Sequence, residues 1–223
     1  MWRKEKKQAA GDLRVRVYPE DAFPAEALPF LVTRPFAPGL IEAVVADYPD
    51  TIRPINRSEI GATHPVDLFT SAVHSAVHDE QTYVKLQEYA RVPYHVIGGT
   101  HRYVGSHVHV LDRYIDVGAA PYGALVALPL PEYVFVHTIR ETHVVSALTI
   151  MSQVAEEFFN EGDRAITPQL YWWRHSPAQV PGSQAPDLRP VGARLNRSDG
   201  FIELFGPDTR ELVELWTADH PSA

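Results

Sequence analysis

The stretch Arg91–Arg140, RVPYHVIGGTHRYVGSHVHVLDRYIDVGAAPYGALVALPLPEYVFVHTIR, decides the fold of this chain. Val, Ile, Tyr and Phe dominate four short runs within it, separated by Gly and Pro, as is typical of strands in a half-buried sheet. The runs are Pro93–Gly98, Ser106–Arg113, Ala124–Leu130 and Glu132–Ile139. Because the gaps between them have the length of hairpin turns, they predict a mainly antiparallel central sheet.

Segments with helical periodicity lie on both sides of this central block. Apolar residues recur at helical spacing in Val144–Asn160, and Asp208–Trp216 is a second, shorter example. Thr63 and Pro65 predict the start of another helix, as N-cap and first-turn residue. Gly39–Tyr48 also has one apolar side and is predicted to be a helix. Together with the run of strands, these segments predict an α+β fold with helices packed on the sheet.

Pro and charged residues indicate how the chain is divided. Residues 1–11 are polar and rich in Lys, and they predict a flexible tail. We expect one α+β domain over residues 12–175. The segment SPAQVPGSQAPDLRP at residues 176–190 is rich in Pro and predicts a long loop. Residues 191–223 predict a hairpin, with a turn at Asp199 and Gly200, and a final helix, both docked on the main domain.

The composition limits the classes of function. The chain has 223 residues, of which 45% are hydrophobic and 22% charged, as in an ordinary globular protein. The formal net charge of -8 repels phosphate backbones and argues against nucleic acid as the main partner. The absence of cysteine excludes disulfides, thiolate metal sites and Cys nucleophiles. Since no signal peptide or long apolar run is visible, we expect a cytoplasmic protein that does not associate with membranes.

Five of the eleven His residues fall in the central block, and they pose the main chemical question. On a predicted strand, His107 and His109 would point to one face, while Val108 and Val110 point to the other and are better buried. Such a pair is half of a metal site for a divalent ion such as zinc. The other ligand could come from His95, His101, His137 or Asp112, and His137 on a neighbouring predicted strand is our choice. The alternative is a solvated sheet face that tolerates His and holds no cofactor.

An aromatic run, LYWWR, predicts a further strand from Leu170 to Arg174. Tyr171 and Trp173 would share one face of this strand, and Leu170 and Trp172 the other. One interpretation is that both faces are core. The rival interpretation is a contact patch formed by Tyr171, Trp172, Trp173 and Arg174, because these residue types dominate binding hot spots. A contact patch requires that at least one of the two Trp side chains is accessible to solvent.

Three groups of motifs carry a resemblance to a known family. They are NRSEI at 56–60 with HPVDLFTSA at 64–72, GALVALP at 123–129 with YVFV at 133–136, and EEFF at 156–159 with AITPQLY at 165–171. In their content and order, over roughly residues 50–175, the chain resembles the YtpQ-like bacterial family of unknown function. The resemblance implies a cytosolic, bacterial α+β protein, and it implies no activity, because the family has no known one.

Two functions from different classes remain open. The first is a non-catalytic protein-binding or accessory factor that engages another protein through an aromatic surface. The second is a small metal-dependent enzyme that uses His107 and His109. We favour the first, because no complete catalytic constellation can be assembled from the sequence. Nothing in the sequence indicates the identity of a partner, a substrate or an oligomeric state.

Overall fold

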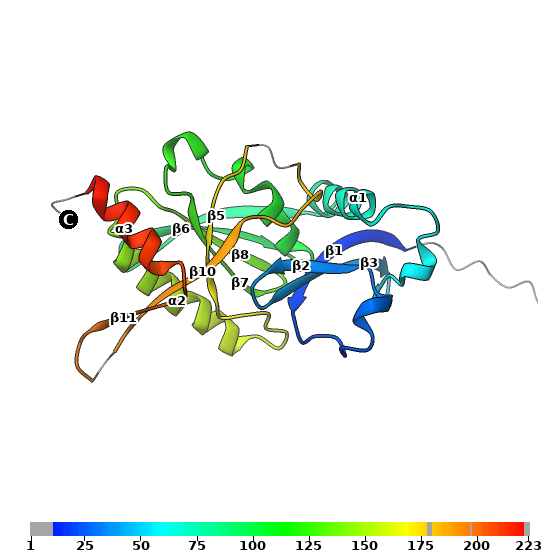
Figure 1. Ribbon diagram of the computed structural model, residues 1–223, viewed down its shortest axis with the longest axis horizontal. Helices are drawn as coiled ribbons and strands as arrows, with labels where there is room; N and C mark the ends of the chain where they lie inside the picture. The colour runs from blue at the N-terminus through cyan, green and yellow to red at the C-terminus, as the bar shows by residue number, and fades with distance from the viewer. Residues whose placement is uncertain (1–10, 178–179, 197, 221–223) are drawn as a thin grey trace, which may run out of the picture.

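The fold is α+β with antiparallel sheets, as predicted, in a computed structural model that describes residues 11–177, 180–196 and 198–220 (Figure 1). The predicted tail therefore lies outside the described residues, except for Gly11. The elements in chain order are β1 (Asp12–Pro19), η1 (Leu28–Phe30), β2 (Thr33–Ala37), β3 (Leu40–Tyr48), β4 (Thr51–Pro54), η2 (Arg57–Glu59), α1 (Pro65–His78), β5 (Thr82–Tyr89), β6 (Val92–Gly99), η3 (Val104–Arg113), η4 (Val117–Ala119), β7 (Ala124–Leu130), β8 (Tyr133–Thr138), α2 (Val144–Glu161), β9 (Leu170–Trp173), β10 (Leu188–Leu195), β11 (Ile202–Phe205) and α3 (Thr209–Asp219).

The large sheet has seven antiparallel strands in the order β11-β10-β9-β7-β8-β6-β5. Three of the four strands predicted in the central block are confirmed, as β6, β7 and β8. Six of the seven residues of β7 are buried, because this inner strand is covered on both faces. Burial on both faces explains why its sequence, ALVALPL, reads as a continuous apolar run without alternation.

Helix α2 covers one face of the large sheet, and its predicted bounds agree closely with the structure. Leu148 and Met151 are fully buried there, in a cluster with Leu125 of β7 and Phe135 of β8. Helix α3 adds Trp216 to the same cluster, and its indole Nε1 donates a hydrogen bond of 2.8 Å to the carbonyl oxygen of Arg140. The C-terminal helix is therefore part of the main core.

The second sheet contains β1, β2 and β4 around the central strand β3. The prediction of a helix over Gly39–Tyr48 is wrong, because β3 occupies this segment. Its residues from Leu40 to Ala46 are buried on both faces, apart from Ile41, and burial on both faces removes the alternation that identifies a strand. β1 pairs with β3 on one side, and β2 and β4 pair with it on the other.

Helix α1 packs on the small sheet, with Phe69 and Val73 against Val15 and Val44. The helix is confirmed, but its predicted N-cap is wrong by one residue. His64 is the N-cap, and its side chain accepts a hydrogen bond from the backbone N–H of Val66.

The segment η3 lies between the two sheets, and the prediction of a strand over Ser106–Arg113 is wrong. Val104, Val108 and Leu111 stand at positions i, i+4 and i+7, and all three pack into the cluster that includes Val134 of β8. The segment consists of short 3₁₀ turns interrupted at Val110, so packing on the sheet overrides the strand preference of its β-branched residues.

β1 passes unusually close to η3. A Cβ atom at Gly105 would lie 2.9 Å from Cγ2 of Val17, so only glycine permits this approach. The hydroxyl of Ser106 donates a hydrogen bond of 2.9 Å to the carbonyl oxygen of Val15. The small sheet is thus tied to η3, and η3 packs on the face of the large sheet opposite α2.

The predicted C-terminal hairpin is confirmed as β10 and β11. β10 begins at Leu188, inside the predicted Pro-rich loop, and pairs with β9 from Leu188↔Trp173 to Val191↔Leu170. The hairpin therefore continues the large sheet. In Figure 1 it extends away from the rest of the molecule beyond α2.

Candidate interaction site

The structure places the predicted aromatic patch inside the protein. Tyr171, Trp172 and Trp173 are only 0, 2 and 5% exposed, because β9 lies between β7 and β10 and both of its faces are covered. The prediction that at least one Trp is accessible is therefore wrong. Arg174 reaches solvent at the end of the strand, with its guanidinium 5.2 Å from the centre of the Trp172 ring.

The division of these side chains between two faces is confirmed. Tyr171 and Trp173 pack in the core on the η3 side, and Trp172 packs in the core on the α2 side. Trp172 Nε1 donates a hydrogen bond of 2.6 Å to the carbonyl oxygen of Tyr122, and the Tyr171 hydroxyl donates one of 2.8 Å to that of Pro38. Burial raises the pKa of Tyr171. These polar atoms are satisfied inside the protein, as buried aromatic residues require.

His107, His109 and His137 do not come together. His107 and His109 lie on η3, which packs against the face of the large sheet that Val136 lines. On β8, His137 shares its face with Phe135, which belongs to the core on the α2 side. Since the sheet separates His137 from the other two rings, the three cannot hold one ion. In the described ranges of the chain, no group of three His, Asp or Glu side chains is placed to hold a metal ion.

Burial does not distinguish the two imidazoles from the flanking valines. His107, Val108, His109 and Val110 are all buried, so the prediction that Val108 and Val110 are the better-buried pair is wrong. The reason is that η3 is helical and enclosed by both sheets and α1, which leaves this segment without a solvated face.

The side chain of His137 bonds a main-chain carbonyl group at the place where the pairing of β8 with β6 ends. β8 pairs with β6 only from His95↔Val136 onward, so the carbonyl group of Pro93 lies beyond the last paired residue. His137 Nδ1 donates a hydrogen bond of 2.6 Å to this carbonyl oxygen. Burial lowers the pKa of His137. The ring therefore has a structural role at this position.

His107 is held as a neutral ring. Its Nδ1 is hydrogen-bonded to the hydroxyl group of Tyr114, seven residues along the chain. Burial, and after it the charges of the nearby His101, Arg113 and His78, lower the pKa of His107 to about 4. At neutral pH this imidazole carries no charge.

His109 belongs to a buried polar network centred on Glu42, which is not among the predicted site residues. Glu42 lies on β3 and is 0% exposed. Its carboxylate accepts hydrogen bonds from Arg34 Nε at 2.5 Å and from His109 Nε2 at 2.9 Å. Because an ionised carboxylate only accepts, this geometry assigns the imidazole proton to Nε2. The signal in the sequence is the single charged residue within the apolar run LIEAVVA.

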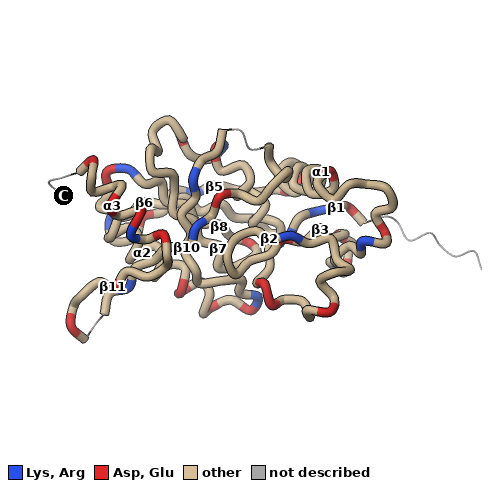
Figure 2. The backbone as a smooth tube through the Cα atoms, viewed as in Figure 1, with Lys and Arg blue, Asp and Glu red and all other residues tan. Residues whose placement is uncertain are grey.

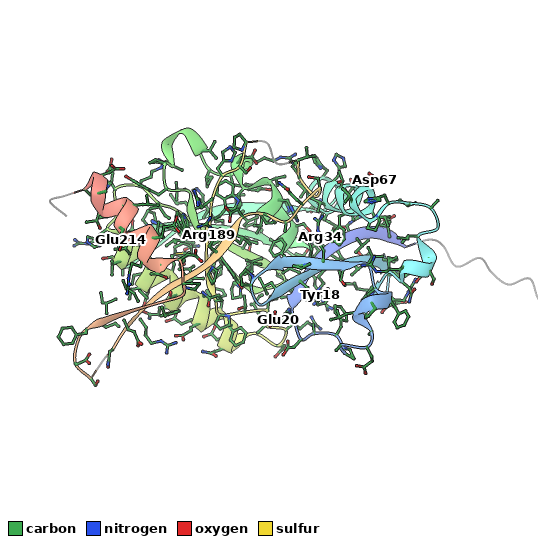
Figure 3. The ribbon with its side chains drawn as sticks, in the orientation of Figure 1. Tyr18, Glu20, Arg34, Asp67, Arg189 and Glu214 are labelled. Carbon is green, nitrogen blue, oxygen red and sulfur yellow. The ribbon has the colours of Figure 1, made fainter. Side chains whose placement is uncertain are left out.

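Arg34 extends the network to two further segments. Its Nη1 donates a hydrogen bond of 3.2 Å to the carbonyl oxygen of Ser183 in the Pro-rich loop. Its guanidinium also lies 4.0 Å from the centre of the Phe69 ring on α1. Figure 3 shows Arg34 on β2. The network therefore joins β2, β3, η3, α1 and the Pro-rich loop through side chains that are largely withdrawn from water.

A groove of about 790 Å³ opens between α2 and β10. Thr149 and Ile150 of α2 line one wall, residues 167–169 line another, and Leu195 of β10 lies at the groove with 48% of its surface exposed. Glu156 of α2 and Arg194 of β10 form an ion pair, with 2.6 Å between Oε1 and Nη2.

The groove contains the unpaired end of a strand, where Leu195 of β10 is exposed and Ala193 is buried. Residues 192–195 of β10 extend beyond β9 and pair only with β11. Successive residues of an antiparallel strand direct their main-chain groups to opposite sides, so Val191, Ala193 and Leu195 all face the β9 side. The side chain of Gln169 ends the ladder by donating to the Val191 carbonyl oxygen at 2.8 Å, and the Ala193 N–H reaches Ser152 Oγ at 3.4 Å. In the part of the chain that the structure describes, no strand lies beside residues 193–195 on this side.

Comparison with protein-family models, with curated proteins and with solved structures gives no match to this chain.

The Glu42 network generates a first prediction, because removal of the carboxylate leaves the Arg34 guanidinium buried without its partner. We expect Glu42→Ala to lower the free energy of unfolding by about 3–5 kcal/mol, as measured by urea denaturation. The matched control is Glu156→Ala, which removes a carboxylate from the exposed pair with Arg194 and should cost about 0.2–1 kcal/mol. Similar losses in the two variants would show that the buried network adds no stability of its own.

A second prediction concerns pH. The pKa of folded His107 is about 4, below its ordinary value of 6.5, so between these values the unfolded chain binds a proton that the folded chain does not. Stability must therefore fall as the pH falls through this window. In His107→Gln this contribution is absent, and urea midpoints measured from pH 7 to 4 should decline less than in the wild type. The exposed His175→Gln should follow the wild-type curve, and an unchanged decline in His107→Gln would contradict the assignment.

Proposed function

We propose that this chain is a non-catalytic protein-binding factor that captures an extended segment of a partner protein in the groove beside β10. The observation that carries the proposal is the unpaired end of β10 at Leu195, which is 48% exposed and lines this groove. An extended peptide can add a strand to such an edge, and the main-chain hydrogen bonds then supply affinity whatever the peptide sequence. The groove replaces the aromatic patch as the contact surface.

The walls of the groove indicate the chemistry of the partner segment. The volume of about 790 Å³ falls in the range of ligand pockets. Ile150 and Leu195 offer apolar contacts, while Glu156 and Arg194 neutralise each other. We therefore expect an uncharged, extended segment whose alternate side chains are apolar, because side chains of a strand point alternately to its two faces.

A protein partner in the cytosol fits the charge and composition better than nucleic acid does. The net charge is -8, and Figure 2 shows Lys and Arg positions scattered along the chain between Asp and Glu positions. The chain has no cysteine and therefore needs no oxidising compartment. Of the helices in the described ranges, none has the length and apolar character needed to cross a bilayer.

The proposal can be tested with peptides selected against the purified chain from a random library displayed on phage. The tightest peptide, labelled with fluorescein, is then titrated with wild-type protein and with Thr149→Arg, which projects a long cation into the groove. We expect the long cation to raise the dissociation constant of the peptide about tenfold or more. A tenfold rise corresponds to a loss of about 1.4 kcal/mol of binding free energy.

The control is Ser146→Arg, which makes the same change of charge on the same helix at an exposed position outside the groove. It should bind the peptide as the wild type does. Equal binding by all three proteins would place the selected peptides elsewhere and overturn the proposal, as would a failure of the library to yield any peptide that binds.

A further inference from the structure

Strand β5 is an exposed edge of the large sheet. It pairs with β6 over eight residues, and in the described chain no strand lies on its other side. All residues from Tyr83 to Tyr89 are exposed, with Leu86 at 68% and Val84 at 45%. Long, regular edges with exposed apolar residues invite pairing with another chain, and natural monomers usually protect them.

The turn after β5 determines which main-chain groups are available. Ala90 and Arg91 have φ values of 48° and 67°, as in the two-residue turns that close tight hairpins. In such a hairpin the flanking residues, Tyr89 and Val92, form a hydrogen-bonded pair, and hydrogen-bonded residues then alternate along the strand. Val84 and Leu86 therefore direct their N–H and C=O groups away from β6, toward solvent.

We propose that β5 pairs with β5 of a second copy of this chain, antiparallel about a two-fold axis that passes through Leu86. The large sheets of the two subunits then form one continuous sheet. This surface lies on the edge opposite β11 and is independent of the groove beside β10.

The sequence of β5 selects this register. In the paired sheet, residues whose N–H and C=O groups point away from β6 must lie opposite each other in the two subunits. These residues alternate along β5, so the two-fold axis passes through a residue and not between two residues. An axis through Lys85 would oppose two ammonium groups, which is unfavourable. An axis through Val84 or Gln87 would not set Tyr83 opposite Tyr89. An axis through Leu86 does, and it also sets Val84 opposite Glu88. An axis through Leu86 sets this residue against its own copy.

The same register also pairs the aromatic residues. Tyr83 then stands opposite Tyr89 of the partner subunit, and aromatic pairs across strands are stabilising. Each strand carries one cation, Lys85, and one anion, Glu88, so two copies of β5 approach each other without net repulsion. The occupant of this edge that the strand itself fits best is therefore a second β5.

Single-cysteine variants test the register directly, because the wild-type chain has no cysteine. Facing residues in a hydrogen-bonded pair have Cα atoms about 5.5 Å apart, a separation that a disulfide can span. We expect Leu86→Cys to form a disulfide-linked dimer under mild oxidation with copper phenanthroline. Lys85→Cys and Gln87→Cys should remain monomeric on a non-reducing gel, because each is displaced along the strand from its own copy.

Sedimentation equilibrium tests the dimer itself. The wild-type chain should sediment with twice the monomer mass, and Leu86→Lys should be shifted toward monomer because it opposes two cations at the axis. Leu204→Lys is the matched control, an exposed leucine on the edge strand β11, and it should stay dimeric. A monomeric wild type, or cross-linking through residue 85 or 87 in preference to residue 86, would overturn the proposal.

Discussion

The buried carboxylate of Glu42 is the constraint on which the arrangement of the two sheets depends. A carboxylate cannot remain charged in a protein interior without hydrogen-bond partners, and its partners here come from different elements. Arg34 belongs to the neighbouring strand β2, and His109 belongs to η3. Because η3 packs on the large sheet, the small sheet must stay against it to keep the charge satisfied. The contact of Arg34 with Ser183 places the Pro-rich loop in the same unit.

This arrangement decides which surfaces are left for other molecules. The centre of the large sheet is covered by α2 and α3 on one face and by η3 with the small sheet on the other. The aromatic residues of β9 lie in that covered centre and are used for packing. What stays open is main chain, along β5 and at Leu195 near the end of β10. Both proposed interfaces therefore rest on strand addition, for which main-chain groups and alternate side chains are sufficient.

The sequence predicts those elements whose local pattern agrees with their final environment. β6 to β8, α1, α2 and the β10–β11 hairpin belong to this group, because their propensity and their packing agree. β3 and η3 do not, since each is enclosed on all sides and an enclosed segment loses the polar face that reveals its period. The β-branched residues of η3 indicate a strand, although the segment forms 3₁₀ turns.

The predicted metal site and the predicted aromatic patch both depended on elements whose environment the local sequence does not reveal. A metal site with His107, His109 and His137 required η3 to be a strand beside β8, and the helical segment instead turns its two imidazoles toward Tyr114 and Glu42. The aromatic patch required β9 to be near an edge of the sheet, and strand order is a long-range property that LYWWR does not contain. Glu42 could be noticed as a lone charge in an apolar run, but its partners could not. His109 lies 67 residues away on a segment predicted to be a strand, and the pairing with Arg34 requires β3, a segment predicted to be a helix.

Native-state hydrogen exchange is the most direct test of whether the Glu42 network makes the two sheets one cooperative unit. The measurement compares the opening free energies of the buried amides of Val44 and Val45 in β3 with those of Val126 and Ala127 in β7. If the network ties the sheets together, the two sets share one value, equal to the free energy of global unfolding. Exchange of the β3 amides through a much less costly opening, with β7 still protected, would contradict the central role of Glu42.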